Sequence, residues 1–156
     1  MTIATLQGRI ALVTGGSRGI GAAISKALAR SGAAVAINYR ERADEANGLV
    51  DSIAKGNGRA VAVPADVSQT SAVAKMVERV KSELGPIDIL VNNAGIAITR
   101  GIDDLSEADF DQTIAINLKS VFLCIQAVLP MMRGRKWGRI VNISSGAARG
   151  AGSAGR

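Results

Sequence analysis

The stretch "VTGGSRGIG" (Val13–Gly21) is the strongest indication of the fold, because three spaced glycines join an apolar run to a helical pattern. Gly15, Gly19 and Gly21 give the spacing G-x-x-x-G-x-G. Glycine at such a turn lets a pyrophosphate reach the backbone N–H groups, and the helix that follows adds free donors and a partial positive charge. Glycine also serves turns for conformational reasons alone. The position on the first strand–helix unit favours the nucleotide interpretation.

Working outward from this loop, short apolar runs alternate with helical patterns. The runs are typical of strands buried on both faces of a parallel sheet, and they lie at 9–14, 34–39, 59–64, 87–91 and 139–144. Apolar residues recur at helical spacing over 20–28 and 73–84. Ser106 and Asp109 match a capping box that opens a long fourth helix, which is predicted to run to about Met132.

Five strands alternating with four helices predict an α/β fold, a Rossmann-like doubly wound parallel sheet. We expect one NAD(P)-binding domain over residues 1–156, with a loose glycine-rich tail at 146–156.

The end of the second predicted strand, "INYRER", is where the adenosine ribose of a dinucleotide would lie. An acidic residue there favours a free 2′-hydroxyl, and a nearby arginine favours a 2′-phosphate. Asn38 stands where an acid would, Arg40 follows it, and Ser17 and Arg18 are placed to contact the same phosphate. NADP is therefore favoured over NAD. The alternative is that Arg40 and Arg42 only cap a solvated helix.

Composition limits the classes of protein and of mechanism. Of the residues, 47% are hydrophobic and 21% charged, as in soluble globular proteins. Cys124 is the only cysteine, which excludes an internal disulfide and fits a reducing cytoplasm. We interpret it as a core or interface residue rather than a nucleophile. Without histidine there is no imidazole base, and a metal site is not expected.

The charge and hydropathy of the sequence indicate whether nucleic acid or a membrane is an expected partner. The net charge is +6, but aromatic residues are only 3% and the basic residues are scattered, so nucleic acid is not an expected partner. The dense group at 133–139 is interpreted as a solvated connection. No apolar run approaches the roughly 20 residues of a membrane span, and the first residues lack a signal-peptide pattern. We expect a cytoplasmic protein without a membrane partner.

The motifs "TGGSRGIG", "ADV", "NNAG", "IAINLKSVF" and "GRIVNISS" occur in this order. In them the sequence resembles the short-chain dehydrogenases/reductases, and most of all the 3-oxoacyl-(acyl-carrier-protein) reductases. The resemblance implies an NADP-dependent oxidoreductase that transfers hydride between a nicotinamide and a carbonyl or hydroxyl substrate. It also implies a small carbonyl or acyl-thioester substrate, and a homo-oligomer for the full-length family.

The resemblance also assigns cofactor residues. Asp66 and Val67 would hold the adenine; from the residues alone, the alternative for Asp66 is an acid at a helix N-terminus, favoured by the dipole. Within "NNAG", Asn92 would stabilise the sheet. The full set of expected cofactor residues is Gly15, Ser17, Arg18, Gly19, Ile20, Gly21, Asn38, Tyr39, Arg40, Asp66, Val67, Asn93, Ala94 and Gly95.

Two catalytic residues follow from the same resemblance. Asn117 matches the family's asparagine that supports a proton-relay water; from the residues alone it is a helix kink or a polar satisfier. Ser145 matches the serine that hydrogen-bonds the substrate carbonyl. In the family a Tyr-x-x-x-Lys pair follows this serine, but the only tyrosine here is Tyr39 and no such pair occurs in the sequence.

We therefore expect a chain truncated before its active site is complete, without the family's C-terminal strands and helices. Its fifth strand would be a sheet edge. Its long helix would expose an apolar stripe that includes Val121, Phe122, Ile125 and Leu129. The expected function is a reductase lineage whose chain alone is inactive. The alternatives are a non-enzymatic NADP-binding module and an unstable truncated product.

Overall fold

The computed structural model describes residues 5–145, so the predicted loose tail lies outside the described residues. Five parallel strands form one sheet in the order β3-β2-β1-β4-β5. Their bounds are β1 (Ile10–Val13), β2 (Ala34–Tyr39), β3 (Arg59–Pro64), β4 (Ile89–Asn92) and β5 (Arg139–Asn142). The α/β prediction is confirmed, and each strand falls within or beside its predicted run.

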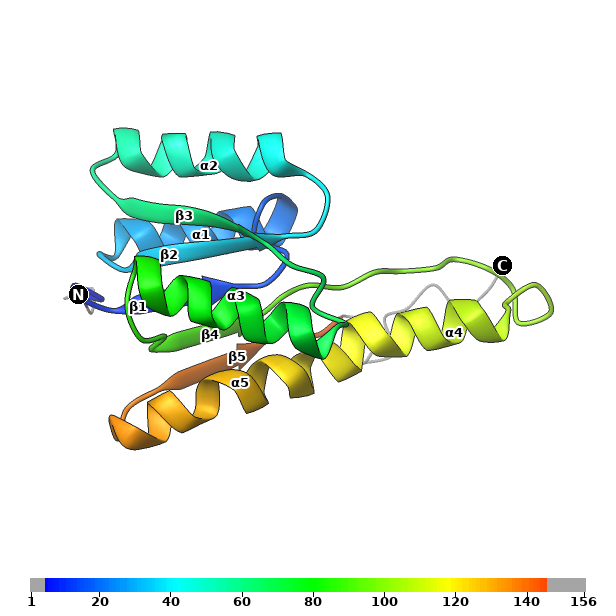
Figure 1. Ribbon diagram of the computed structural model, residues 1–156. Coiled ribbons are helices and arrows are strands. Elements are labelled where there is room, and N and C mark those ends of the chain that lie inside the picture. The colour runs from blue at the N-terminus through cyan, green and yellow to red at the C-terminus, as the bar shows by residue number, and fades with distance from the viewer. Residues whose placement is uncertain (1–4, 146–156) are drawn as a thin grey trace.

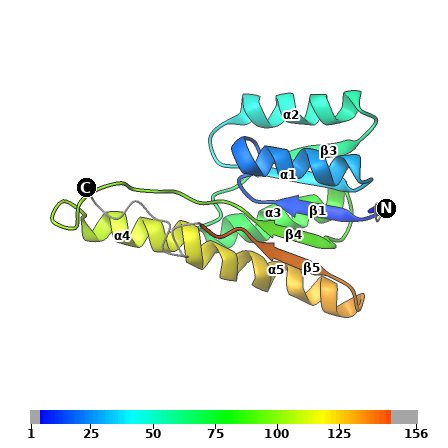
Figure 2. The same ribbon diagram turned by 180° about the vertical axis from the view of Figure 1, so that it is seen from behind.

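Helices cover both faces of the sheet. Figure 1 shows α3 (Thr70–Glu83) and α5 (Ser120–Gly134) in front of it, and Figure 2, seen from behind, shows α1 (Gly19–Arg30) on the other face, with α2 (Ala43–Lys55) above. Side chains alternate along β1 accordingly. Leu12 packs with the α3 and α5 side chains, and Val13 packs with those of α1 and α2. Because both faces are buried, strands need continuous apolar runs.

The strand order reverses at β1. The chain goes from β1 outward to β2 and β3, and then returns to place β4 on the other side of β1. In open α/β sheets ligands bind outside the carboxyl ends of the strands at such a reversal. This places the expected site at the ends of β1 and β4, beside the glycine loop.

The predicted capping box is confirmed. Ser106 Oγ accepts a hydrogen bond from the Asp109 N–H at 3.1 Å, and Asp109 Oδ2 accepts one from the Ser106 N–H at 3.1 Å. The helix that follows is continuous through α4 (Glu107–Ile114), the π-helical turn η1 (Ala115–Lys119) and α5.

By length and composition alone this helix, Glu107–Gly134, could cross a membrane, since it has 28 residues and its most apolar 18-residue window has a mean hydropathy of 1.7. Sequence reading missed this because it counted uninterrupted apolar runs. The α5 part packs on the sheet and α3, where Leu123, Cys124 and Val128 are buried.

The edge prediction is confirmed for β5, whose Ile140, Val141 and the following Ile143 are 37%, 46% and 39% exposed. The predicted helix stripe needs correction. Of the four residues predicted to form it, only Phe122 is exposed. Val121, Ile125 and Leu129 are half-buried. The exposed large apolar residues of this helix are spaced by four and lie earlier, at Phe110, Ile114, Leu118 and Phe122.

Candidate cofactor site

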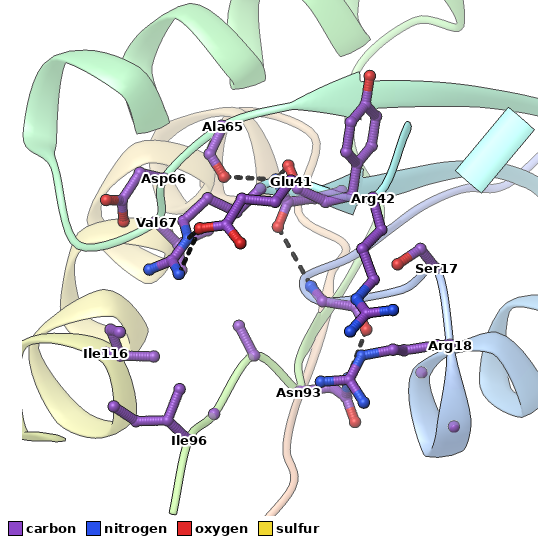
Figure 3. A pocket seen from close by; sticks show the side chains of 18 of the residues that line it. Ser17, Arg18, Glu41, Arg42, Ala65, Asp66, Val67, Asn93, Ile96 and Ile116 are labelled. Carbon is purple, nitrogen blue, oxygen red and sulfur yellow. Dashed lines mark hydrogen bonds and ion pairs between the residues drawn. The ribbon is translucent and has the colours of Figure 1, made fainter. Parts of the chain in front are cut away.

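A cleft of about 320 Å³ lies at the carboxyl ends of the strands, where the topology reverses. All the residues predicted to bind cofactor line it. Sequence reading did not assign five further lining residues, which are Glu41, Arg42, Ala65, Ile96 and Ile116. Ile96 and Ile116 lie together across the cleft from Ser17 and Arg18 (Figure 3). The volume falls within the usual range for small-molecule sites of about 300–1,000 Å³.

Two glycines let the loop wrap tightly under the cleft. Gly15 has φ +58°, and a Cβ built on it would lie 3.0 Å from the Ala94 Cα. A Cβ on Gly21 would clash with the Gly15 carbonyl oxygen and lie 2.6 Å from Asn93 Nδ2. The loop is therefore closed on itself and on the segment after β4, as the glycine spacing predicts.

Thr14 and Asn93 hold that arrangement. Thr14 Oγ1 accepts hydrogen bonds from the N–H groups of Asn93 and Ala94, both at 3.0 Å. Asn93 Nδ2 donates to the carbonyl oxygens of Thr14 and Gly15, also both at 3.0 Å. The segment "NNAG" thus locks the glycine loop from the β4 side.

The first turn of α1 faces the cleft without a capping group of its own. Arg18 is the N-cap residue, its side chain makes no capping bond, and the first turn contains no acidic residue. Gly19 has φ +53° with open space where a Cβ would stand. The free N–H groups of the first turn can donate to a phosphate, the helix dipole favours its negative charge, and glycine leaves room for it.

The second strand ends differently from the sequence prediction. Asn38 was placed where an acid would face the ribose, but its side chain is buried and fully hydrogen-bonded within the fold. The exposed charges, Arg40 and Arg42, come two and four residues later, between β2 and α2. Arg40 pairs with Glu41 at 2.6 Å, and Arg42 pairs with Glu45 at 2.8 Å. Figure 3 shows Arg42 reaching toward Arg18 above the glycine loop.

Asp66 follows β3 at the far end of the cleft (Figure 3). Its Oδ1 accepts hydrogen bonds from the Ser68 N–H at 2.9 Å and the Ser68 Oγ at 2.7 Å. Partial burial raises the pKa of Asp66, but the Ser68 hydrogen bonds and the charge of Arg40 outweigh it and leave the pKa below its ordinary value. An ionised Asp66 keeps its other oxygen as an acceptor, which suits an exocyclic amine.

The two predicted catalytic residues do not line the cleft. Asn117 lies in the π-helical turn, where its Oδ1 accepts from the Ile96 N–H and its Nδ2 donates to the Ile96 carbonyl, both at 2.9 Å. It therefore braces one wall of the cleft. Ser145 lies beyond the end of β5 and is exposed. The structure brings the cofactor residues together and leaves this serine at the periphery.

Comparison with known proteins identifies this arrangement. The family model for short chain dehydrogenases matches residues 9–155. The chain belongs to the short-chain dehydrogenase family. Members of this family are NAD(P)-dependent oxidoreductases, which agrees with a glycine loop placed at the β1 and β4 strand ends.

Three similar proteins illustrate the likeness. The 3-oxoacyl-(acyl-carrier-protein) reductase FabG of Staphylococcus epidermidis is 42% identical over 135 residues, which are 86% of this chain and 55% of that protein. A short chain dehydrogenase from Burkholderia cenocepacia, solved in complex with NADP, matches with a TM-score of 0.86 at 44% identity, covering 96% of this chain and 60% of the other. A blue fluorescent protein from a metagenomic library, solved with NADPH, matches with a TM-score of 0.88 at 42% identity, covering 97% and 61%.

This short-chain dehydrogenase chain spans about half the length of the curated relatives it matches. The family match over residues 9–155 includes every residue that lines the cleft. The Tyr-x-x-x-Lys pair that the resemblance implies has no counterpart in this sequence.

Proposed function

We propose that this chain binds NADP and forms the cofactor half of a carbonyl reductase site. The observation that carries the proposal is the cradle at the β1–α1 turn. There a Cβ on Gly21 would strike Asn93, and the uncapped first turn of α1 opens into the cleft. Related proteins solved with NADP and NADPH support the choice of cofactor.

The residues that line the cleft fit NADP both at its pyrophosphate and at its adenosine 2′-phosphate. A pyrophosphate would lie on the first turn of α1, held by the N–H groups beyond Gly19. Arg18, Arg40 and Arg42 line the cleft near the end of β2, where a 2′-phosphate would be held. Each of the last two already pairs with a glutamate, so a phosphate would replace or share an existing partner. Asp66 and Val67 would hold the adenine.

The bound nicotinamide would supply the hydride, which is the chemistry the protein cannot provide itself. Ser145 would hydrogen-bond the substrate oxygen and orient it. Asn117 would hold the wall at Ile96 and support a water. No group in the sequence stands in for the tyrosine acid, since Tyr39 lies at the adenosine end of the cleft. Loss of a general acid alone costs about 10²–10⁴ in rate, so we propose that this chain alone does not turn over.

The substrate class follows from the relatives only as a proposal. We favour a 3-oxoacyl thioester or another small carbonyl compound, in the cytoplasm, with a homo-oligomer for a full-length relative. A non-enzymatic NADP-binding module is the second candidate. It is favoured by the contrast between a complete cofactor cleft and a sequence without Tyr-x-x-x-Lys.

Titration of the purified chain with NADPH, followed by cofactor fluorescence, tests the proposal. Gly19→Asp puts a carboxylate where the phosphate would lie, in open space, and is expected to abolish saturable binding. Gly8→Asp is the matched control, because Gly8 also has a positive φ with open space around it and lies outside the cleft. Equal binding by the two variants, or no saturable binding by the folded parent chain, would overturn the proposal.

Turnover is measured in the same preparation with an acetoacetyl ester. Binding without turnover supports the incomplete site and the binding module alike. Turnover that Ser145→Ala abolishes would refute the proposed inactivity. A flat thermal melt with strong binding of a hydrophobic dye would instead identify an unstable product.

A further inference from the structure

The side chain of Asn38 links two loops that line the cleft. Asn38 is the penultimate residue of β2 and is 2% exposed. Its Oδ1 accepts from the Gly15 N–H at 3.2 Å, and its Nδ2 donates to the carbonyl oxygens of Ala65 at 3.1 Å and Val63 at 3.3 Å. Figure 3 shows Ala65 at the edge of the cleft, next to Asp66.

These bonds connect the two loops that would contact opposite ends of the expected cofactor. Gly15 opens the glycine loop, and Ala65 immediately precedes Asp66 on the adenine side. The Asn38 main chain adds to the link, because its carbonyl oxygen accepts from the Gly16 N–H at 2.8 Å. One buried residue thus fixes the distance between the pyrophosphate cradle and the adenine wall.

We propose that Asn38 is a positioning residue that sets this spacing, and that it does not itself discriminate NADP from NAD. The inference rests on the proposed cofactor binding. It differs from the usual role of a residue at the end of this strand, where an acidic side chain selects NAD by binding the ribose. Here the Asn38 side chain is engaged in hydrogen bonds within the fold. The exposed arginines that follow, Arg40 and Arg42, would therefore discriminate NADP from NAD.

The chemistry of the site requires an amide. An amide has one acceptor for the Gly15 N–H and a donor group for the carbonyls on the other side. A carboxylate keeps the acceptor but has no donor. Its second oxygen would face the Ala65 and Val63 carbonyl oxygens at about the present 3.1 and 3.3 Å, as a buried charge without a partner.

The first test compares the affinities of Asn38→Asp for NADPH and NADH. Both are expected to weaken by about tenfold or more, since a buried polar partner is lost, and by the same factor. Val80→Ala, a fully buried α3 position outside the cleft, controls for lost stability and should leave both affinities unchanged at temperatures where it is folded. A variant that gains NADH affinity relative to NADPH by tenfold would overturn the proposal.

The second test needs no cofactor. Burial and the two carbonyls disfavour the charged form of the introduced carboxyl, so its pKa is raised in the folded state. Its stabilising, protonated form is present at low pH and is lost as pH rises through that folded pKa. The melting-temperature gap between Asn38→Asp and the parent should therefore widen from pH 4.5 to pH 8. Asn38→Ala, which adds no charge, should show a gap that does not change with pH.

The two tests separate the two hypotheses. If the parent chain binds neither cofactor while the pH-dependent gap appears, the proposed function fails and the link between the loops stands. If the gap is independent of pH, the side chain does not face the two carbonyls, and the inference is wrong whatever the cofactor affinities. A variant that folds at pH 4.5 and not at pH 8 supports the inference as strongly as a measured gap.

Discussion

Replacing glycine by alanine in two helices of this chain should change stability in opposite directions. Gly48 lies in α2, is exposed and has open space around it. Alanine there should stabilise by about 0.5–1 kcal/mol, its usual advantage over glycine in a helix. Gly21 lies in α1, where the added methyl group would clash with the Gly15 carbonyl oxygen and approach Asn93 Nδ2 at 2.6 Å. The same helix advantage applies, but steric terms oppose it.

The magnitude for Gly21→Ala follows from the contacts. Moving the Asn93 amide loses its two hydrogen bonds, worth about 0.5–1.5 kcal/mol each. Overpacking adds about 1–3 kcal/mol. Less the helix advantage of about 1 kcal/mol, the net loss is about 1–5 kcal/mol. A central loss of about 3 kcal/mol lowers the melting temperature by about 6–12 °C in a chain of this size.

Thermal melts of the parent chain, Gly21→Ala and Gly48→Ala under one condition decide the matter. The expected order of melting temperature is Gly48→Ala, parent, Gly21→Ala. If Gly21→Ala melts at or above the parent, the tight closure of the glycine loop on Asn93 is not present in solution. The cradle argument for a pyrophosphate would then fail with it.

Three further outcomes are expected. Hydrogen bonds from Ser106 hold the pKa of Asp109 below its ordinary value of 3.8, despite some desolvation, so its stabilisation is present above that value and lost as pH falls through the folded pKa. Asp109→Asn should melt lower than the parent at pH 7, with a gap that closes in acid. Burial raises the pKa of Cys124 to about 12, so a thiol reagent at pH 8 should label the chain only after denaturant is added. Asp88→Ala should cost about 1–3 kcal/mol in urea unfolding, because the buried Ile10 N–H loses its carboxylate acceptor at 3.0 Å; an unchanged midpoint would contradict that contact.

Much of the fold could be predicted from the sequence because each strand here is buried on both faces. Such strands must be continuous apolar runs, and the runs at 34–39 and 59–64 coincide with β2 and β3 as observed. The capping box at Ser106 was equally readable, since its side chains act on the nearest backbone groups. Local sequence patterns therefore predicted the strands and helices, and their alternation predicted the topology of the sheet.

The sequence did not predict the surroundings of Asn38, whose side chain bonds residues far away in the sequence. Asn38 looked like a ribose-facing position, because strand alternation does not say which loops will close over a strand end. Its partners Gly15 and Ala65 lie 23 and 27 residues away. For Asn117 the interpretation from the residues alone, a helix kink or a polar satisfier, agrees with the structure. The side chain lies in a π-helical turn and its amide bonds the backbone of Ile96, 21 residues earlier.

The residues that line the cleft and the predicted catalytic serine come from different parts of the sheet. Every residue that lines the cleft lies between Gly15 and Ile116, so the cleft needs β1, β2, β3, β4 and their loops, and nothing from β5. Ser145, by contrast, follows an edge strand with exposed apolar residues. Ligands that bind only the folded state stabilise it by about 2.7 kcal/mol at 100 times Kd. The proposed cofactor would therefore stabilise the fold through the loops of β1–β4, whereas the proposed substrate contact of Ser145 lies beyond β5.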